Sequence, residues 1–136
     1  MTEVAQTARV LLADDDREFR TALAELLRGD GNEVAEAEDG AALLERLAEA
    51  EPGPDGYDLV ITDFRMPGYD AFDVMLRVRP EATKTPFVLL TAFGDANTDL
   101  LAKRLGAVAV LHKPVDFAEV RAVVSDVLSR RSGPWP

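Results

Sequence analysis

The chain has 136 residues, 47% hydrophobic and 29% charged, which fits one ordinary globular domain and excludes an intrinsically disordered segment. A formal net charge of −10 argues against direct binding to nucleic acid, which requires a basic surface, and favours cations or basic proteins as partners. The absence of cysteine excludes disulfides and thiolate metal sites.

The ends of the chain carry no targeting signal that we recognise. The first ten residues are too short and polar for a signal peptide, and no apolar stretch reaches the roughly 20 residues that cross a bilayer. We therefore expect a cytoplasmic protein that makes no membrane contact. We further expect an N-terminal extension at 1–7, one folded domain at 8–130 and a C-terminal tail at 131–136.

In the first half of the chain, short apolar runs that predict buried strands alternate with segments of helical periodicity. The expected elements are a strand at 9–13, a helix at 16–29, a strand at 32–38, a helix at 39–50, a loop at 51–56 and a strand at 57–63. The first strand runs into three consecutive aspartates, the last of which, Asp16, is placed to begin the following helix.

The second half repeats the alternation. The expected elements are a helix at 70–78, a strand at 85–91, a helix at 95–106, a strand at 107–114 and a helix at 116–131. Asp116 is the expected N-cap of the last helix. Five strand–helix units imply an α/β fold: a doubly wound five-stranded parallel sheet with right-handed crossovers and helices on both faces.

Polar residues end most of the predicted strands. They are Asp14 and Asp15, Asp63, Thr91 and Lys113. Because the carboxyl ends of parallel strands meet at one edge of a sheet, we expect three carboxylates, one hydroxyl and one ammonium to converge there.

Such crowding of carboxylates requires compensation, because like charges repel and burial disfavours their ionised form. Mg²⁺ would provide it, since this ion takes oxygen ligands and needs only one or two carboxylates. The set also suits phosphoryl transfer, with Asp63 as nucleophile and Lys113 and Thr91 at the transferred oxygens. No further catalytic base is evident, which favours a slow, timed reaction.

Four motifs in this order resemble the receiver domains of two-component response regulators. They are ADDD (13–16), VITDFRMPG (60–68), LLTAFGD (89–95) and GAVAVLHKP (106–114). The resemblance covers about residues 8–130. It implies a flavodoxin-like (βα)5 fold with strand order 2-1-3-4-5.

The resemblance also implies roles for individual residues. Asp63 would accept a phosphoryl group from a histidine kinase, or from a phosphotransfer protein, and lose it by slow autodephosphorylation. Asp15 and Asp63 would bind Mg²⁺ directly, Asp14 through water, and Arg65 through its backbone carbonyl.

Thr91 and Lys113 match the family's phosphate-stabilising and switch positions, but two neighbouring positions depart from the pattern. Val110 stands where receivers usually carry the switch Tyr or Phe, and Ala71 stands where glycine is common. The first departure puts in doubt the usual aromatic signal. Arg65, which borders the site, is expected to tune the lifetime of the phosphorylated state.

Two alternatives remain at this stage. A receiver-like interaction module would signal without phosphorylation. A haloacid-dehalogenase-like phosphohydrolase would use Asp14 and Asp16, although Glu18 stands where that family has Thr or Val, and Asp63 would then have no role.

The output is open as well. A chemotaxis-type stand-alone receiver would act on an unknown output protein, whereas an excised receiver would belong to an attached output domain; a phosphorylation-dependent homodimer fits either. The Met1 start and short tail favour the first arrangement, while DFRMPG and TAFGD resemble receivers attached to transcriptional regulators. His112, Met66 and Phe93 are interpreted as packing or surface residues and not as ligands.

Overall fold

A computed structural model describes residues 7–50, 56–78, 85–92 and 96–131. Strands and helices alternate through these residues as β1 (Arg9–Ala13), α1 (Arg17–Gly29), β2 (Glu33–Ala37), α2 (Gly40–Glu49), β3 (Leu59–Asp63), α3 (Ala71–Val78), β4 (Phe87–Thr91), α4 (Ala96–Arg104), β5 (Ala107–His112) and α5 (Phe117–Arg131). Each predicted strand and helix is present, with its ends within two residues of the prediction. The predicted loop at 51–56, apart from Gly56, and Phe93 lie outside the described residues.

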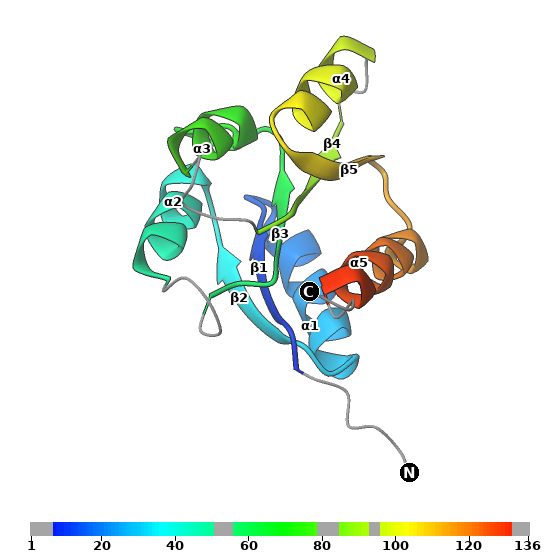
Figure 1. Ribbon diagram of the computed structural model, residues 1–136. Helices are drawn as coiled ribbons and strands as arrows, with labels where there is room; N and C mark the ends of the chain where they lie inside the picture. The colour runs from blue at the N-terminus through cyan, green and yellow to red at the C-terminus, as the bar shows by residue number, and fades with distance from the viewer. Residues whose placement is uncertain (1–6, 51–55, 79–84, 93–95, 132–136) are drawn as a thin grey trace, which may run out of the picture.

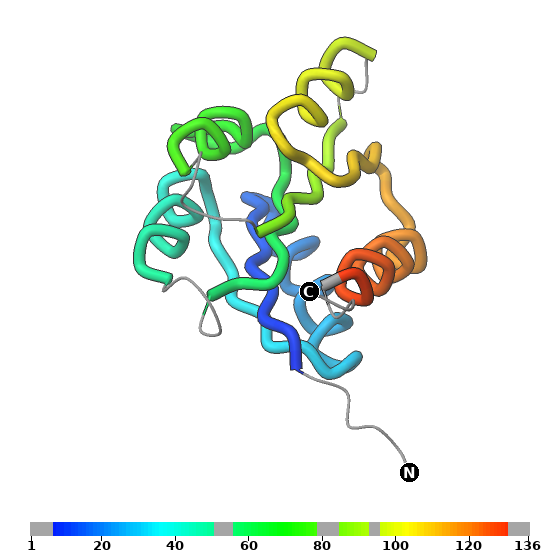
Figure 2. The backbone as a smooth tube through the Cα atoms, in the orientation of Figure 1, coloured from blue at the N-terminus to red at the C-terminus, as the bar shows by residue number. Residues whose placement is uncertain are grey.

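The strands form one parallel sheet in the order β2-β1-β3-β4-β5, which confirms the predicted fold class. Figure 1 shows the sheet running through the middle of the molecule, and the backbone trace in Figure 2 follows the same alternation of strand and helix. The chain reverses its direction of winding between β1 and β3, so their carboxyl ends flank the position where open α/β sheets bind ligands.

Helices cover both faces of the sheet, which explains why the strands are apolar without alternation. Val10 and Leu12 of β1 pack in the core beneath α1 and α5, while Leu11 and Ala13 pack in the core beneath α2, α3 and α4. All four side chains are fully buried. The sheet is therefore a rigid platform whose carboxyl edge is free to carry polar residues.

Aspartates fix the starts of three helices. Asp16 accepts a hydrogen bond from the Phe19 amide at 3.1 Å, and Asp39 accepts one from Ala42 at 2.8 Å. Asp116 accepts one from the Ala118 amide at 2.9 Å, in agreement with its predicted capping role. The third aspartate of the opening motif thus begins α1, as predicted, and satisfies an amide that the helix itself leaves unpaired.

Gly40 at the start of α2 allows a close approach between two loops. A Cβ at this position would overlap the backbone carbonyl of Tyr69, so any larger residue would force the two segments apart. Tyr69 belongs to the segment between β3 and α3 that follows Asp63. The contact therefore fixes the loop on one side of the sheet edge.

Among the helices of the described ranges, none combines the length and apolar content that crossing a bilayer requires.

Candidate functional site

Three carboxylates meet at the carboxyl edge of the central strands. Asp14 and Asp15 directly follow β1, and Asp63 is the last residue of the neighbouring β3. One carboxylate oxygen from each residue lies within 4.8 Å of the others. Asp14 is fully buried and Asp63 is 8% exposed, whereas Asp15 is exposed to solvent. The cluster is thus closed on the protein side and open on one side to water.

Lys113 brings a positive charge into this cluster from the far end of the sequence. Its ammonium lies 2.9 Å from Asp14 Oδ2 and 3.5 Å from Asp63 Oδ1. The Lys113 amide donates to the Thr91 carbonyl at 2.7 Å, which fixes the backbone immediately after β5. The Lys113 ammonium therefore contacts two of the three carboxylates of the cluster.

Burial and neighbouring charges shift the pKa of Asp63. Burial and the nearby charges of Asp14 and Asp15 raise the pKa of Asp63 from 3.8 to about 6, although Lys113 lowers it. Burial lowers the pKa of Lys113, but the hydrogen bonds and charges of Asp14 and Asp63 outweigh it and raise that pKa. Asp63 is therefore largely ionised above pH 6, but its charged form is costly without a further cation.

Thr91, the last residue of β4, is 1% exposed. Leu90 pairs with Asp63 across β3 and β4, so Thr91 lies one residue beyond the level of the Asp63 Cα. Arg65 is exposed, two residues past Asp63. The structure therefore places both predicted residues at the same edge of the sheet as the acids.

Val110 of β5 pairs with Leu89 of β4 and packs, half-buried, in the core beneath α2, α3 and α4. The next residue but one, His112, is half-exposed and contacts Asp99 of α4 at 3.1 Å. Met66 is buried and packs in the same core as Val110. These placements agree with the surface and packing roles predicted for His112 and Met66.

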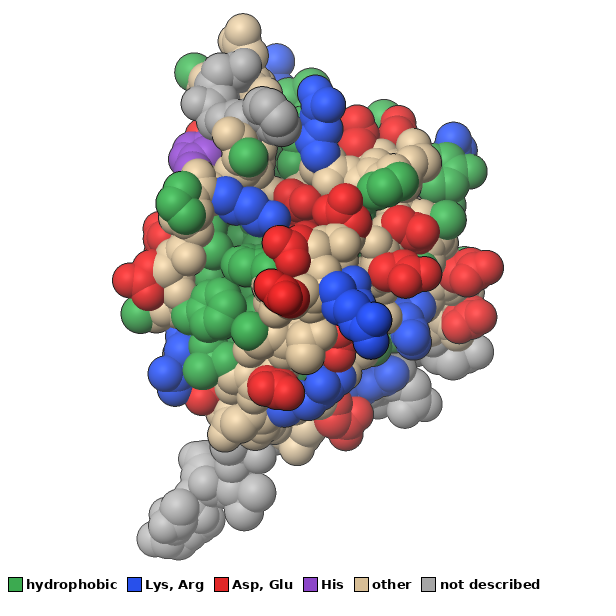
Figure 3. Space-filling model, turned by 180° about the vertical axis from the view of Figure 1, so that it is seen from behind, with side chains coloured by type: hydrophobic (Ala, Val, Ile, Leu, Met, Phe, Trp, Pro, Cys, Tyr) green, Lys and Arg blue, Asp and Glu red, His purple; other side chains and the backbone are tan. Residues whose placement is uncertain are grey.

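Acidic side chains also lie outside the cluster. On the face drawn in Figure 3 they are interspersed with basic ones. Most of these charges are exposed and screened by solvent, unlike the buried Asp14. Burial together with convergence therefore distinguishes the site from the general acidity of the chain.

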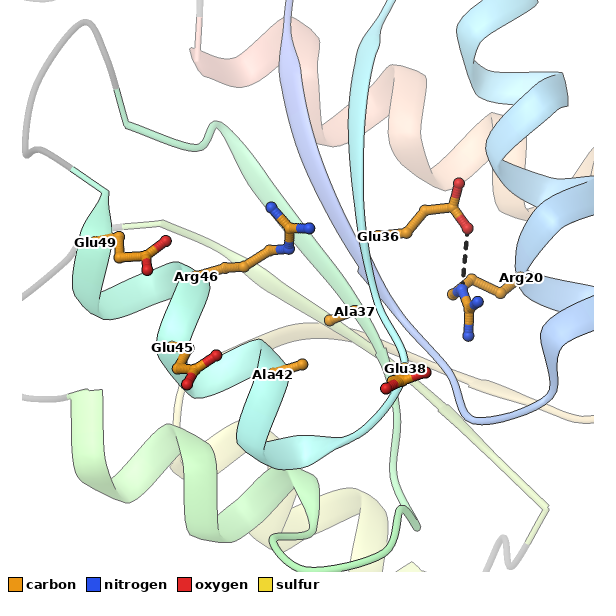
Figure 4. A pocket seen from close by; sticks show the side chains of 8 residues that line it. All are labelled: Arg20, Glu36, Ala37, Glu38, Ala42, Glu45, Arg46 and Glu49. Carbon is orange, nitrogen blue, oxygen red and sulfur yellow. Dashed lines mark hydrogen bonds and ion pairs between the residues drawn. The ribbon is translucent and has the colours of Figure 1, made fainter.

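Sequence reasoning missed Arg20 of α1, which supports the loop that carries the aspartates. Arg20 Nη1 donates to the Asp14 carbonyl at 2.8 Å, and its Nε donates to Glu36 Oε1 of β2 at 2.9 Å. Figure 4 shows this pair in the wall of a pocket beside α2, with Arg46 reaching in from that helix. No sequence signal singles out Arg20, because its partners are distant in the chain or belong to the backbone.

A second unpredicted neighbour is aromatic. The ring centroid of Phe19 lies 4.7 Å from the Lys113 ammonium, within the range of a cation–π contact. The sequence assigned Phe19 only to the apolar face of a helix.

Comparison with known proteins identifies this arrangement. The chain matches the family model of the response regulator receiver domain over residues 10–125. The chain belongs to this family. Receiver domains are signalling domains of two-component systems and not enzymes in the usual sense, and response regulators act together with histidine kinases and output domains. The resemblance inferred from the four motifs is confirmed.

Among its relatives, the chain is 32% identical to the transcriptional regulatory protein ZraR of Klebsiella oxytoca, over 88% of the chain and 26% of ZraR. It is 35% identical to the transcriptional regulatory protein CpxR of Escherichia coli (strain K12), over 90% of the chain and 50% of CpxR. The chain spans between a quarter and a half of the length of these relatives.

Solved structures agree with the sequence relatives. A receiver domain protein from Clostridium thermocellum is 28% identical, with a TM-score of 0.81 over 92% of the chain and 97% of that protein. The non-phosphorylated HemR receiver domain from Leptospira biflexa is 29% identical, with a TM-score of 0.79 over 96% of the chain and 98% of that domain.

Proposed function

We propose that this receiver, comprising residues 8–130, accepts a phosphoryl group on Asp63 in a Mg²⁺-dependent reaction and thereby switches protein–protein contacts. The donor would be the phosphohistidine of a histidine kinase or phosphotransfer protein. The observation that carries the proposal is the convergence of the Asp14, Asp15 and Asp63 oxygens within 4.8 Å, with the Lys113 ammonium in contact with two of these carboxylates.

The residues at this edge fit Mg²⁺. The donors are oxygens, their combined charge is negative, and the exposed side at Asp15 leaves room for the water ligands that Mg²⁺ retains. Asp15 and Asp63 would bind the ion directly, Asp14 through water, and Arg65 through its backbone carbonyl. When bound, the ion neutralises negative charge on the transferred phosphoryl group.

Asp63 supplies the nucleophile. A carboxylate oxygen forms a bond to phosphorus while the bond from phosphorus to the imidazole nitrogen breaks, and the electron pair of that bond leaves with the histidine. The pKa of about 6 keeps Asp63 mainly ionised near neutral pH. Lys113, 3.5 Å from the acceptor carboxylate, would pair with a phosphoryl oxygen, and the Thr91 hydroxyl would donate to another.

Reversal requires water to attack the acyl phosphate. A receiver of this kind would return to its resting form by slow autodephosphorylation, which suits a signal with a limited lifetime. Both this autodephosphorylation and a cytoplasmic location are proposed from the general behaviour of the family.

The output would be a changed protein surface. We propose that the phosphorylated chain binds an output protein, an attached output domain or a second copy of itself through α4, β5 and α5. Exposed apolar side chains on α4 and β5, namely Leu100, Leu101 and Val108, support this choice. Val110 stands at the switch position of the family without its aromatic ring, so this chain would switch without the usual aromatic signal. Unchanged amide chemical shifts across residues 95–128 on phosphorylation would exclude this surface.

Intact mass spectrometry after incubation with acetyl phosphate tests the proposal. Wild type with Mg²⁺ should gain about 80 Da, one phosphoryl group, whereas Asp63→Asn or omission of Mg²⁺ should prevent the gain. No adduct on wild type, combined with no fluoroberyllate complex, would favour a module that signals without phosphorylation. Steady ester hydrolysis that survives loss of Asp63 but not of Asp14 would favour a phosphohydrolase.

A further inference from the structure

Lys113 has a third neighbour besides the two carboxylates. Its ammonium lies over the ring of Phe19, 4.7 Å from the centroid. Phe19 is the third residue of α1 and therefore reaches the site from the helix that begins directly after the aspartates. A cation at this distance is attracted by the electrons of the ring face.

The ring itself is held in place. The backbone amide of Phe19 donates to the capping Asp16. The Phe19 ring packs edge-to-face on Phe117 of α5, with centroids 5.7 Å apart and planes at 66°. Phe19 also packs against the core beneath α1 and α5. The ring is thus fixed by α1, α5 and the core before any ligand binds.

Lysine needs such a support more than arginine would. Its ammonium is a point charge on a flexible four-carbon stem, with no planar fork to set its direction. The contact to buried Asp14 is 2.9 Å and the contact to the acceptor Asp63 is 3.5 Å, so the carboxylates alone favour the Asp14 side. The Phe19 ring adds a third contact to the ammonium and so restricts the positions that the flexible stem can take.

We propose that Phe19 is a positioning residue that holds the Lys113 ammonium beside the phosphoacceptor. This inference rests on the proposed function of Asp63. Phe19 offers no oxygen ligand, so its loss should slow phosphoryl transfer and leave Mg²⁺ affinity unchanged. The Phe19–Phe117 pair also connects the ammonium to the start of α5.

Phe19→Leu and Phe19→Tyr test the ring directly. Phe19→Leu retains apolar packing and removes the ring, and it should lower the rate of acetyl phosphate labelling about 3- to 10-fold. Phe19→Tyr should restore the wild-type rate. Leu26→Ala is the matched control: Leu26 is half-buried on the same helix and packs in the same core, so its loss should lower stability without slowing labelling.

A second readout does not depend on phosphorylation. In the metal-free protein, the Lys113 ε-methylene protons should show an upfield ring-current shift that disappears in Phe19→Leu and remains in Phe19→Tyr. Wild-type labelling by Phe19→Leu, or a loss of rate that Phe19→Tyr does not restore, would overturn the inference. If wild type is not labelled at all, the proposed function fails. Absence of the wild-type ring-current shift would then separately overturn the placement of Lys113 by Phe19.

Discussion

Two charged clusters in this receiver meet at Asp14 and differ in how their charged groups are paired. The arginine cluster consists of Arg20, Arg28 and Glu36, and the acid cluster consists of Asp14, Asp15 and Asp63. Glu36 accepts from Arg20 at 2.9 Å and from Arg28 at 3.2 Å, while backbone carbonyls accept from the same two guanidinium groups.

In the acid cluster, one ammonium, that of Lys113, contacts two of the three carboxylates, Asp14 and Asp63. In the arginine cluster, the charged groups are hydrogen-bonded to one another and to backbone carbonyls, and the cluster therefore fixes structure. In the acid cluster, burial and the neighbouring carboxylates raise the pKa of Asp63, and the proposed function assigns an external cation to this charge.

The largest effect is expected in the arginine cluster. Arg20→Ala should lower the free energy of unfolding by about 2–4 kcal/mol, because it removes two charge-assisted hydrogen bonds, the shorter of the two that Glu36 accepts and the one to the Asp14 carbonyl. Urea denaturation measures this change. Arg20→Lys keeps the charge but not both contacts and should lie between wild type and Arg20→Ala. A loss below about 0.5 kcal/mol for Arg20→Ala would show that this cluster is not structural.

The acid cluster should respond in the opposite direction. The pKa of Asp63 is about 6 in the folded protein and 3.8 ordinarily, so folding favours its protonated form. Its charge costs nothing below pH 3.8, an increasing amount between pH 3.8 and 6, and the full amount above pH 6. Asp63→Asn should therefore stabilise the metal-free protein by about 1–3 kcal/mol at pH 7.5.

Urea denaturation of wild type and Asp63→Asn from pH 3.5 to 7.5 measures this difference. The gain should disappear toward pH 3.5, where wild-type Asp63 is protonated in both states. A variant less stable than wild type at pH 7.5 would contradict the view that the ionised Asp63 carboxylate destabilises the metal-free fold.

Loss of the Lys113 charge should have a smaller effect, which is a rise in the pKa of Asp63. Because its charge and hydrogen bond lower the pKa of Asp63, Lys113→Met should raise that pKa above its present value of about 6. Titration of the Asp63 carboxyl carbon by ¹³C NMR in metal-free protein measures the shift. An unchanged or lower pKa would place Lys113 outside the cluster.

The smallest effect is expected where a charge pair lies in solvent. Arg121 makes two contacts with Asp30, at 2.9 and 2.7 Å, yet both side chains are substantially exposed. Arg121→Ala should cost about 0.2–1 kcal/mol, which matches the range for exposed ion pairs. If urea denaturation gives the same loss as for Arg20→Ala, burial does not distinguish the two pairs.

The sequence predicted the fold because strand and helix patterns were strong and alternated without interruption. It also predicted the convergence of Asp14, Asp15 and Asp63, since parallel strands place their carboxyl ends together. The positions of these acids could be predicted from the sequence because each acid follows or ends a strand.

Arg20 and Phe19 could not be predicted in the same way. Their roles depend on side-chain direction and on partners such as Glu36 and Lys113, which the helical period does not identify. Periodicity placed Phe19 correctly on the inner face of α1. It could not indicate that Lys113, which follows β5, reaches the same ring.

Thermal unfolding with and without Mg²⁺, at matched ionic strength, tests most directly whether the acid cluster is a cation site. Saturating Mg²⁺ should raise the midpoint of wild type by roughly 5 °C, because the ion binds only the folded chain. Asp126→Asn, which removes an exposed carboxylate of α5 distant in sequence from the cluster, should show the same rise. Asp15→Asn should show little or none. An equal rise in wild type and Asp15→Asn would contradict the account.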